Sequence, residues 1–194
     1  QGANFQQKTS VLPQNEAVRK ALAAWQGGAV VKQTESEIPE KNAPPAPTLV
    51  LEKLRSAGVL LLPVSRESNW LSLSFINLPQ PPDSVFVLLE KLAPQVLWLN
   101  LDYGKIPPEA WPLLGKLTQL RRLSLAHTTV TDMDLTHLKG LPSLNYLNLA
   151  ETQVTGSGLQ VLAEMPGLAQ LFLYKTNVAV ISLSFLFPCS SNTL

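Results

Sequence analysis

LRRLSLAHTTVTDMDLTHLKGL at residues 120–141 and LNYLNLAETQVTGSGLQVLAEM at residues 144–165 are two copies of one pattern. Each copy has leucine at its first, fourth and sixth positions, and the two copies start 24 residues apart. The same phase runs from residue 96 onward, through Val96, Leu120, Leu144, Leu168; Leu99, Leu123, Leu147, Leu171; and Leu101, Leu125, Leu149, Leu173. Periods of about 20 to 50 residues are typical of solenoids. Residues 96–194 are therefore predicted to be a repeat array.

The pattern inside one repeat predicts its secondary structure. Alternating leucines point to one face of a strand, and the residues between them point to the other. We expect strands at about residues 99–101, 123–125, 147–149 and 171–173. The second half of each repeat predicts a helix, with Trp111, Leu135 and Leu159 facing the core. This gives an α/β, right-handed solenoid with a parallel concave sheet and convex helices.

The register of this prediction can be tested at two adjacent residues. Leu147 is expected to be fully buried between Leu123 and Leu171, while Tyr146 is expected to face outward. The reverse placement would move every predicted surface residue to the wrong face.

A degenerate repeat is predicted at residues 71–95. A shift of 25 residues aligns it with the first regular repeat, pairing Leu71, Ile76, Phe86, Leu89 and Leu92 with Val96, Leu101, Trp111, Leu114 and Leu117. Ser74 then stands where leucine is expected. End repeats of solenoids are atypical because they cover the core on one side and face water on the other.

The segments before this repeat predict a short helical N-terminal segment and a cap. Residues 1–14 are interpreted as a disordered lead, followed by an amphipathic helix that Asn15 caps and Gly27-Gly28 end. Residues 31–47 contain four prolines, which favour a linker. The predicted division is 1–47 for lead, helix and linker, 48–95 for the cap and degenerate repeat, and 96–194 for the repeats with a C-terminal cap. Because the chain starts at Gln1 without a signal peptide, we expect a mature chain or an excised fragment.

Three local predictions refine the cap region. Thr48 is expected to cap a helix that runs to Gly58, and the apolar run 59–64 is expected to form a buried strand. Asp83 is expected to cap a helix that ends near Leu92. At the other end, residues 179–194 keep the apolar phase but lose its polar positions, so a native cap and an aggregation-prone boundary both remain open.

The repeats resemble the leucine-rich-repeat family, in the short bacterial variety that reads LxxLxLxxTxVTDxGLxxLxxL. Residues 49–77, including RSAGVLLLPVSRESNWLSLSFIN, further resemble a region of bacterial envelope proteins that join c-type cytochrome-like domains to such repeats. The first resemblance implies a solenoid and a protein-binding role. The second implies a periplasmic or envelope location within a larger protein.

Threonines at one repeat position are predicted to be structural. Thr128, Thr152 and Thr176 are expected to turn inward and bond the backbone where each strand ends. Thr131-Asp132 and Thr155-Gly156 are expected to cap the helices that follow.

The outward strand positions define the predicted binding face. Its candidate partner-binding residues are Trp98, Asn100, Asp102, Arg122, Tyr146, Asn148, Gln170, Phe172 and Tyr174, with Ser124, Ala126 and Ala150 between them. Aromatic residues and arginine dominate binding hot spots. We therefore expect a non-catalytic module for a protein partner or another domain of the parent chain. A glycan-binding surface and a purely structural spacer remain the alternatives.

Composition and motifs disfavour other functions. A net charge of +1 gives no electrostatic footprint for nucleic acid, and no apolar stretch is long enough to insert in a membrane. The single cysteine, Cys189, falls at a core position, and His127 and His137 are interpreted as solvated. We expect no metal, no cofactor and no catalytic residue, because neither metal-ligand spacing nor a catalytic motif is present.

Overall fold

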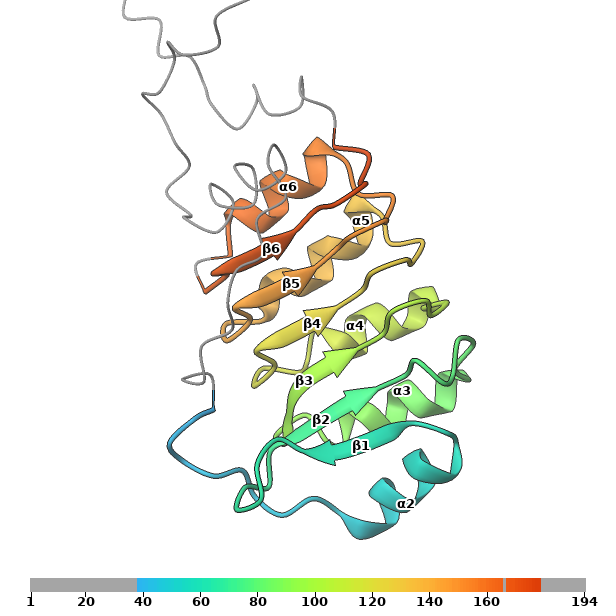
Figure 1. Cartoon of the computed structure of the whole chain (residues 1–194), viewed down its shortest axis with the longest axis vertical. Coiled ribbons are helices and arrows are strands. Elements are labelled where there is room, and N and C mark those ends of the chain that lie inside the picture. Colours follow the sequence, from blue (N-terminus) through green and yellow to red (C-terminus); the bar gives the residue numbers. More distant parts are fainter. Residues whose placement is uncertain (1–37, 166, 179–194) are drawn as a thin grey trace, which may run out of the picture.

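The computed structural model describes residues 38–165 and 167–178, and within them one sheet forms the frame of the molecule (Figure 1). Its strands stand in sequence order as β1 (Leu60–Pro63), β2 (Leu71–Ser74), β3 (Val96–Asn100), β4 (Arg122–Ser124), β5 (Tyr146–Asn148) and β6 (Gln170–Phe172). Strands β2 to β6 pair in parallel, which confirms the predicted repeat sheet.

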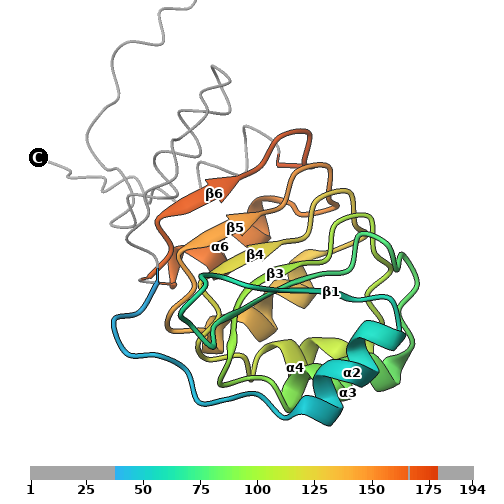
Figure 2. The same ribbon diagram turned by 60° about the horizontal axis from the view of Figure 1, so that its bottom comes forward.

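Short helices lie together on one face of this sheet (Figure 2). They are α2 (Thr48–Ser56), α3 (Asp83–Glu90), α4 (Trp111–Leu114), α5 (Asp132–Leu135) and α6 (Gly156–Ala163), with the 3-10 turns η2 (Pro108–Ala110) and η3 (Thr136–Gly140). Trp111, Leu135 and Leu159 are buried on this side, as predicted. Among the described helices, none has the length and apolarity needed to cross a bilayer.

The register prediction is confirmed. Leu147 is 0% exposed and pairs with Leu123 on one side and Leu171 on the other, whereas Tyr146 is half-buried on the opposite face. The leucines of all three repeat columns are buried in one continuous core.

The degenerate repeat departs from the predicted alignment by one residue within its strand. The register shifts between Leu71 and Ser72, so that Leu73 stands opposite Leu99 and Ser74 stands opposite Asn100. Phe75, which is buried and stacks on Phe86 with ring centroids 5.9 Å apart, fills the core position predicted for Ile76. Ile76 is exposed. Ser74 is thus an outward residue and does not interrupt the leucine pattern.

Strand β1 reverses the chain direction at the N-terminal end of the sheet. It pairs antiparallel with β2, and only Leu61 of its leucines is buried, because Leu60 and Leu62 are 43% and 51% exposed. The prediction of a buried strand at residues 59–64 was therefore wrong in burial. An edge strand at the end of a solenoid has one neighbour and leaves one face open.

Prolines displace two predicted helix caps. Pro47 and Pro82 occupy the N-cap positions of α2 and α3, so Thr48 and Asp83 are the first helical residues and make no cap hydrogen bond. The ring of proline fixes φ near the value that the chain needs as it enters a helix. Helix α2 also ends at Ser56, before Gly58.

The two threonine caps within the repeats are confirmed. Thr131 forms a capping box with Asp134, and the Thr155 hydroxyl accepts a hydrogen bond from the Ser157 amide. Asp132 has a further role that was not predicted. Its carboxylate accepts hydrogen bonds from the Thr155 amide at 2.7 Å and the Thr155 hydroxyl at 2.5 Å, which ties two consecutive repeats together.

The predicted threonine column is also confirmed. The hydroxyls of Thr128, Thr152 and Thr176 donate to the carbonyls of Leu125, Leu149 and Leu173 respectively. Each bond satisfies a carbonyl at the point where a strand has ended, and the first two threonines are buried.

Replacing Thr152 by valine should lower the free energy of unfolding by about 1–3 kcal/mol, because the buried Leu149 carbonyl would lose its partner. Chemical denaturation followed by circular dichroism measures this. Thr129→Val, at an exposed position, serves as the control and should change stability by less than about 0.5 kcal/mol. Equal stability of the two variants would show that the column is dispensable.

Residues 38–47 form no helix or strand, as predicted for a linker, yet they pack against the first repeats. The domain division itself stays a prediction. The predicted helix after Asn15, the disordered lead, the C-terminal segment 179–194 and Cys189 lie outside the described residues.

Candidate functional site: the open sheet face

The face of the sheet opposite the helices carries two cross-strand rows of side chains, and together they are called the open sheet face here. Strand pairing aligns Trp98, Arg122, Tyr146 and Gln170 in one row. The second row contains Asn100, Ser124, Asn148 and Phe172. All eight side chains are partly exposed. The structure therefore brings together, on adjacent strands, eight residues of the predicted binding face.

Aromatic rings flank the one arginine in these rows. The guanidinium carbon of Arg122 lies 4.4 Å from the ring centroid of Tyr146 and 5.4 Å from that of Trp98. Tyr146 in turn contacts Phe172, with ring centroids 5.1 Å apart. Cation–π contacts of this kind hold a guanidinium in place while leaving its planar edge for hydrogen bonds. The four side chains form a preorganised aromatic surface with one positive charge at its centre.

The second row is linked by its own hydrogen bonds. The Asp102 carboxylate accepts from Asn100 Nδ2 at 3.2 Å, from the Ser124 hydroxyl at 2.6 Å and from the Ala126 amide at 2.8 Å. Asn148 Nδ2 donates to the Ser124 hydroxyl at 3.1 Å. These bonds fix the polar side chains in one arrangement and engage the charge of Asp102 within the protein.

The row that follows the strands matches the prediction less well. Ala126, predicted to face outward, is only 5% exposed, so this prediction was wrong. Strand β4 ends at Ser124, and the alternation of faces ends with it. Ala150 is partly exposed, and Tyr174 is exposed and lies 5.2 Å from the Lys175 ammonium.

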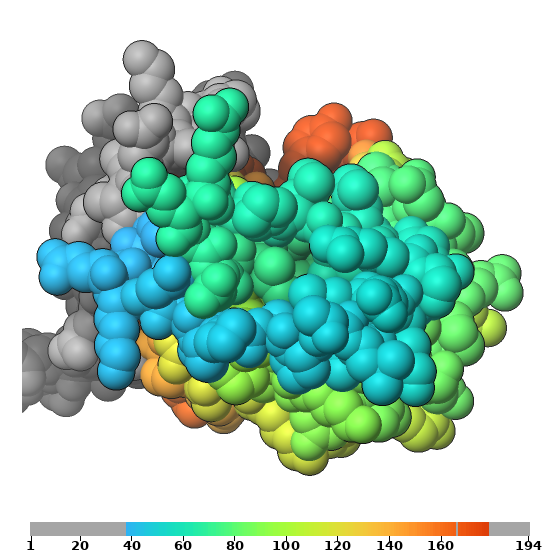
Figure 3. All heavy atoms as spheres, turned by 90° about the horizontal axis from the view of Figure 1, so that it is seen from below, coloured from blue at the N-terminus to red at the C-terminus, as the bar shows by residue number. Residues whose placement is uncertain are grey.

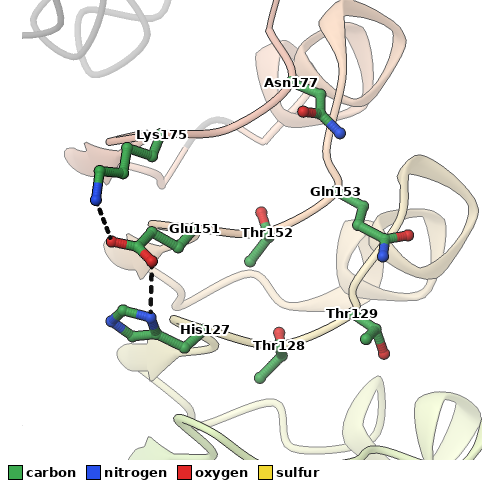
Figure 4. A pocket seen from close by; sticks show the side chains of 8 residues that line it. All are labelled: His127, Thr128, Thr129, Glu151, Thr152, Gln153, Lys175 and Asn177. Carbon is green, nitrogen blue, oxygen red and sulfur yellow. Dashed lines mark hydrogen bonds and ion pairs between the residues drawn. The ribbon is translucent and has the colours of Figure 1, made fainter.

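A column of large side chains borders the open sheet face where the strands end, and sequence reasoning did not give it a role. Tyr103, His127, Glu151 and Lys175 all have positive φ, between 52° and 60°. The Tyr103 and His127 rings stack at 4.3 Å, and Glu151 pairs with His127 Nδ1 at 3.1 Å and with Lys175 Nζ at 3.2 Å (Figure 4). The Glu151 carboxylate raises the pKa of Lys175 above its usual value, through this hydrogen bond and its charge.

This bordering column makes His127 a bridging residue, whereas the sequence suggested a solvated one. Beside the column, a shallow polar groove runs over Thr128 and Thr152 toward Thr129, Gln153 and Asn177 (Figure 4). The only sequence signal for the column is its constant place in the repeat, two residues after the third leucine.

The described residues do not contain a group of three or more His, Cys, Asp or Glu side chains placed to hold a metal ion. The prominent polar side chains of the open sheet face hydrogen-bond one another, and Asp132 is bound to Thr155. The arrangement can present a rigid surface to a partner.

Comparisons with known proteins agree with the repeat pattern. Residues 118–178, which include β4, β5 and β6, match the family described as leucine rich repeat. Among solved structures, an internalin from Listeria monocytogenes is 26% identical with a TM-score of 0.41, over 51% of this chain and 29% of that one. The chain therefore spans less than a third of that internalin. None of the curated proteins matches.

Proposed function

We propose that this chain, a leucine-rich-repeat protein, is a non-catalytic interaction module whose open sheet face binds a protein partner or a neighbouring domain of a longer parent chain. The observation that carries the proposal is the aromatic cluster around Arg122. Tryptophan, tyrosine and arginine are the residues most enriched in binding hot spots, and here they lie side by side on a regular sheet.

Preorganisation supports the same conclusion. Binding normally loses free energy when flexible side chains become ordered, at about 0.5–1.5 kcal/mol for each one. Arg122 and Tyr146 are already held by their neighbours, so less ordering remains to be done on binding. A surface with fixed aromatic rings and a fixed guanidinium suits a partner that offers apolar side chains around a carboxylate.

The hydrogen-bond pattern favours a protein over a glycan. A sugar is recognised through many directed hydrogen bonds from amide and carboxylate side chains. On this face Asn100, Asp102 and Asn148 already bond one another or the backbone. The face thus offers aromatic contact area with few polar groups directed outward, which is the composition of a protein interface core.

Arg122→Ala and Tyr146→Ala are each expected to weaken partner binding about tenfold or more, since both residues belong to the central cluster. The partner is first captured with the full chain from a bacterial envelope extract and identified by mass spectrometry. Its affinity for each variant is then measured by calorimetry with purified components.

Lys139→Ala provides the matched control for removal of a cation. Lys139 lies in η3 on the helix side, where it is paired with Glu164 at 2.7 Å. Its loss should leave the affinity unchanged, and all three variants should keep the thermal stability of the parent within a few degrees. If Arg122→Ala and Tyr146→Ala bind as tightly as the parent, the open sheet face is not the binding site.

The envelope location implied by the second resemblance extends this proposal. In that setting the module would sit beside a redox domain of its parent chain and bind it or hold it at a distance. Fractionation of cells that express the full-length gene, with antibody detection of the repeats, tests the location directly.

A further inference from the structure

Residues 38–47, called the strap here, run beside the turns that precede β2, β3 and β4 before they enter α2 (Figures 1 and 3). Asn42 Oδ1 accepts from the Asn69 amide at 2.7 Å, and Asn69 Nδ2 donates to the Ala43 carbonyl at 2.8 Å. Gln95 Nε2 donates to the Pro44 carbonyl at 3.3 Å. The strap is an extended, proline-containing segment that the repeats hold largely through its backbone carbonyls.

Side-chain packing completes the contact. Ala43 is buried in a small cluster with Trp70 and Leu97, and Ile38, Val64 and Trp98 pack around it. This cluster is separate from the main core. The repeats therefore already bind one proline-containing segment at this edge of the sheet.

A pocket remains open between the strap and the repeats. Its walls on the repeat side are Trp70, Ala93, Pro94, Thr118 and Gln119. Pro39, Lys41, Asn42, Ala43 and Pro44 form the strap side. Proline, alanine and tryptophan make most of this lining apolar, and the polar residues Thr118 and Gln119 lie at its exposed margin.

Two buried polar atoms at this pocket have no hydrogen-bond partner. Trp70 is 4% exposed and its Nε1 donor is unpartnered, and the same holds for Gln95 Oε1, next to Pro94. A buried tryptophan N–H usually finds an acceptor. An apolar pocket that supplies one strong donor suits a ligand rich in carbonyl groups and poor in N–H groups.

We propose that this pocket binds a short, extended, proline-containing segment of another polypeptide, alongside the strap. Proline has no backbone N–H, so such a segment brings carbonyls to Trp70 Nε1 and leaves few donors unsatisfied against the apolar walls. A non-proline residue within it supplies the N–H that Gln95 Oε1 can accept. The strap shows that the same edge accepts this backbone type.

The test titrates the full chain with a fluorescein-labelled decapeptide, APPAPPAPPA, which extends the APPAP of residues 43–47. Saturable binding by fluorescence anisotropy is expected, and a control peptide with serine in place of every proline should bind about tenfold more weakly or worse. The proposal is overturned if the parent chain shows no saturable binding up to about 1 mM, or if the two peptides bind alike.

Gln119→Trp fills the pocket from an exposed position and should weaken peptide binding at least about tenfold, whereas Gln160→Trp, exposed on α6, should leave it unchanged. Trp70→Phe keeps a ring but removes the donor, with an expected loss of about three- to tenfold. Trp111→Phe, at a tryptophan equally buried on the helix side, is its control.

Equal losses for both members of either pair would contradict the assignment. Hydrogen exchange of residues 38–47 separates binding beside the strap from replacement of it. Exchange that is unchanged or slowed by the peptide supports the proposal. Faster exchange would mean that the peptide displaces the strap, and the pocket beside it would not be the site.

Discussion

Leu147→Ala is expected to lower the free energy of unfolding by about 2–5 kcal/mol, through the lost transfer of its side chain from water and the cavity left behind. Leu147 is 0% exposed and lies between Leu123 and Leu171 of the neighbouring repeats. Regular repeats on both sides leave little room for the site to collapse. In a solenoid, stability depends on interfaces between neighbouring repeats, and this substitution weakens two of them.

Urea denaturation of the full chain, followed by far-ultraviolet circular dichroism, measures the effect. Leu71→Ala makes the same chemical change at a half-exposed residue of the end repeat and should cost less. Tyr146→Ala, one residue away on the open sheet face, should cost under about 1 kcal/mol. If Leu147→Ala were no more destabilising than Leu71→Ala, burial between repeats would not set the cost.

Gly158→Ala is expected to destabilise the protein by about 1–3 kcal/mol, although alanine is favoured over glycine inside a helix by about 1 kcal/mol. Gly158 lies within α6. A Cβ there would stand 2.5 Å from Asp132 Oδ1 and 2.9 Å from Val154 Cγ1. The Asp132 carboxylate is held by two hydrogen bonds from Thr155, so it cannot move aside without losing them.

Gly140→Ala is the matched control for this prediction. A Cβ at Gly140 would meet only the Gly115 carbonyl oxygen, at an ordinary distance of 3.6 Å. Thermal melts of the two variants should therefore shift in opposite directions, or only the Gly158→Ala melt should move downward. A rise in melting temperature for Gly158→Ala would show that helix propensity outweighs the close contact of two repeats.

The 24-residue period was sufficient to predict most of the fold, because a leucine column is a local signal that repeats along the chain. It located the strands, the buried Leu147 and the outward Trp98, Arg122 and Tyr146. It failed at the end repeat, where one rigid offset was applied across a register shift between Leu71 and Ser72. A bulge leaves no mark in a pattern of apolar residues.

The remaining errors have similar causes. Ala126 was placed by an alternation that holds only while the strand lasts, and β4 ends at Ser124. The bordering column, including Tyr103 and His127, adopts positive φ, which glycine or asparagine would have signalled and these residues do not. The contacts of the strap join residues far apart in sequence, so no local pattern could have indicated that Asn42 bonds Asn69.

The antiparallel β1 and the register shift beside it divide the sheet into two parts with different tolerance to changes in length. From β3 to β6 the register advances by 24 residues at each step, so duplicating one whole repeat there would keep every leucine in place. Each added repeat would widen the open sheet face by one strand spacing, about 4.8 Å. A duplication across β1 and β2 would join strands of opposite direction and break the stack. Gene duplication could therefore adjust the reach of this surface in whole-strand steps, from one part of the chain alone.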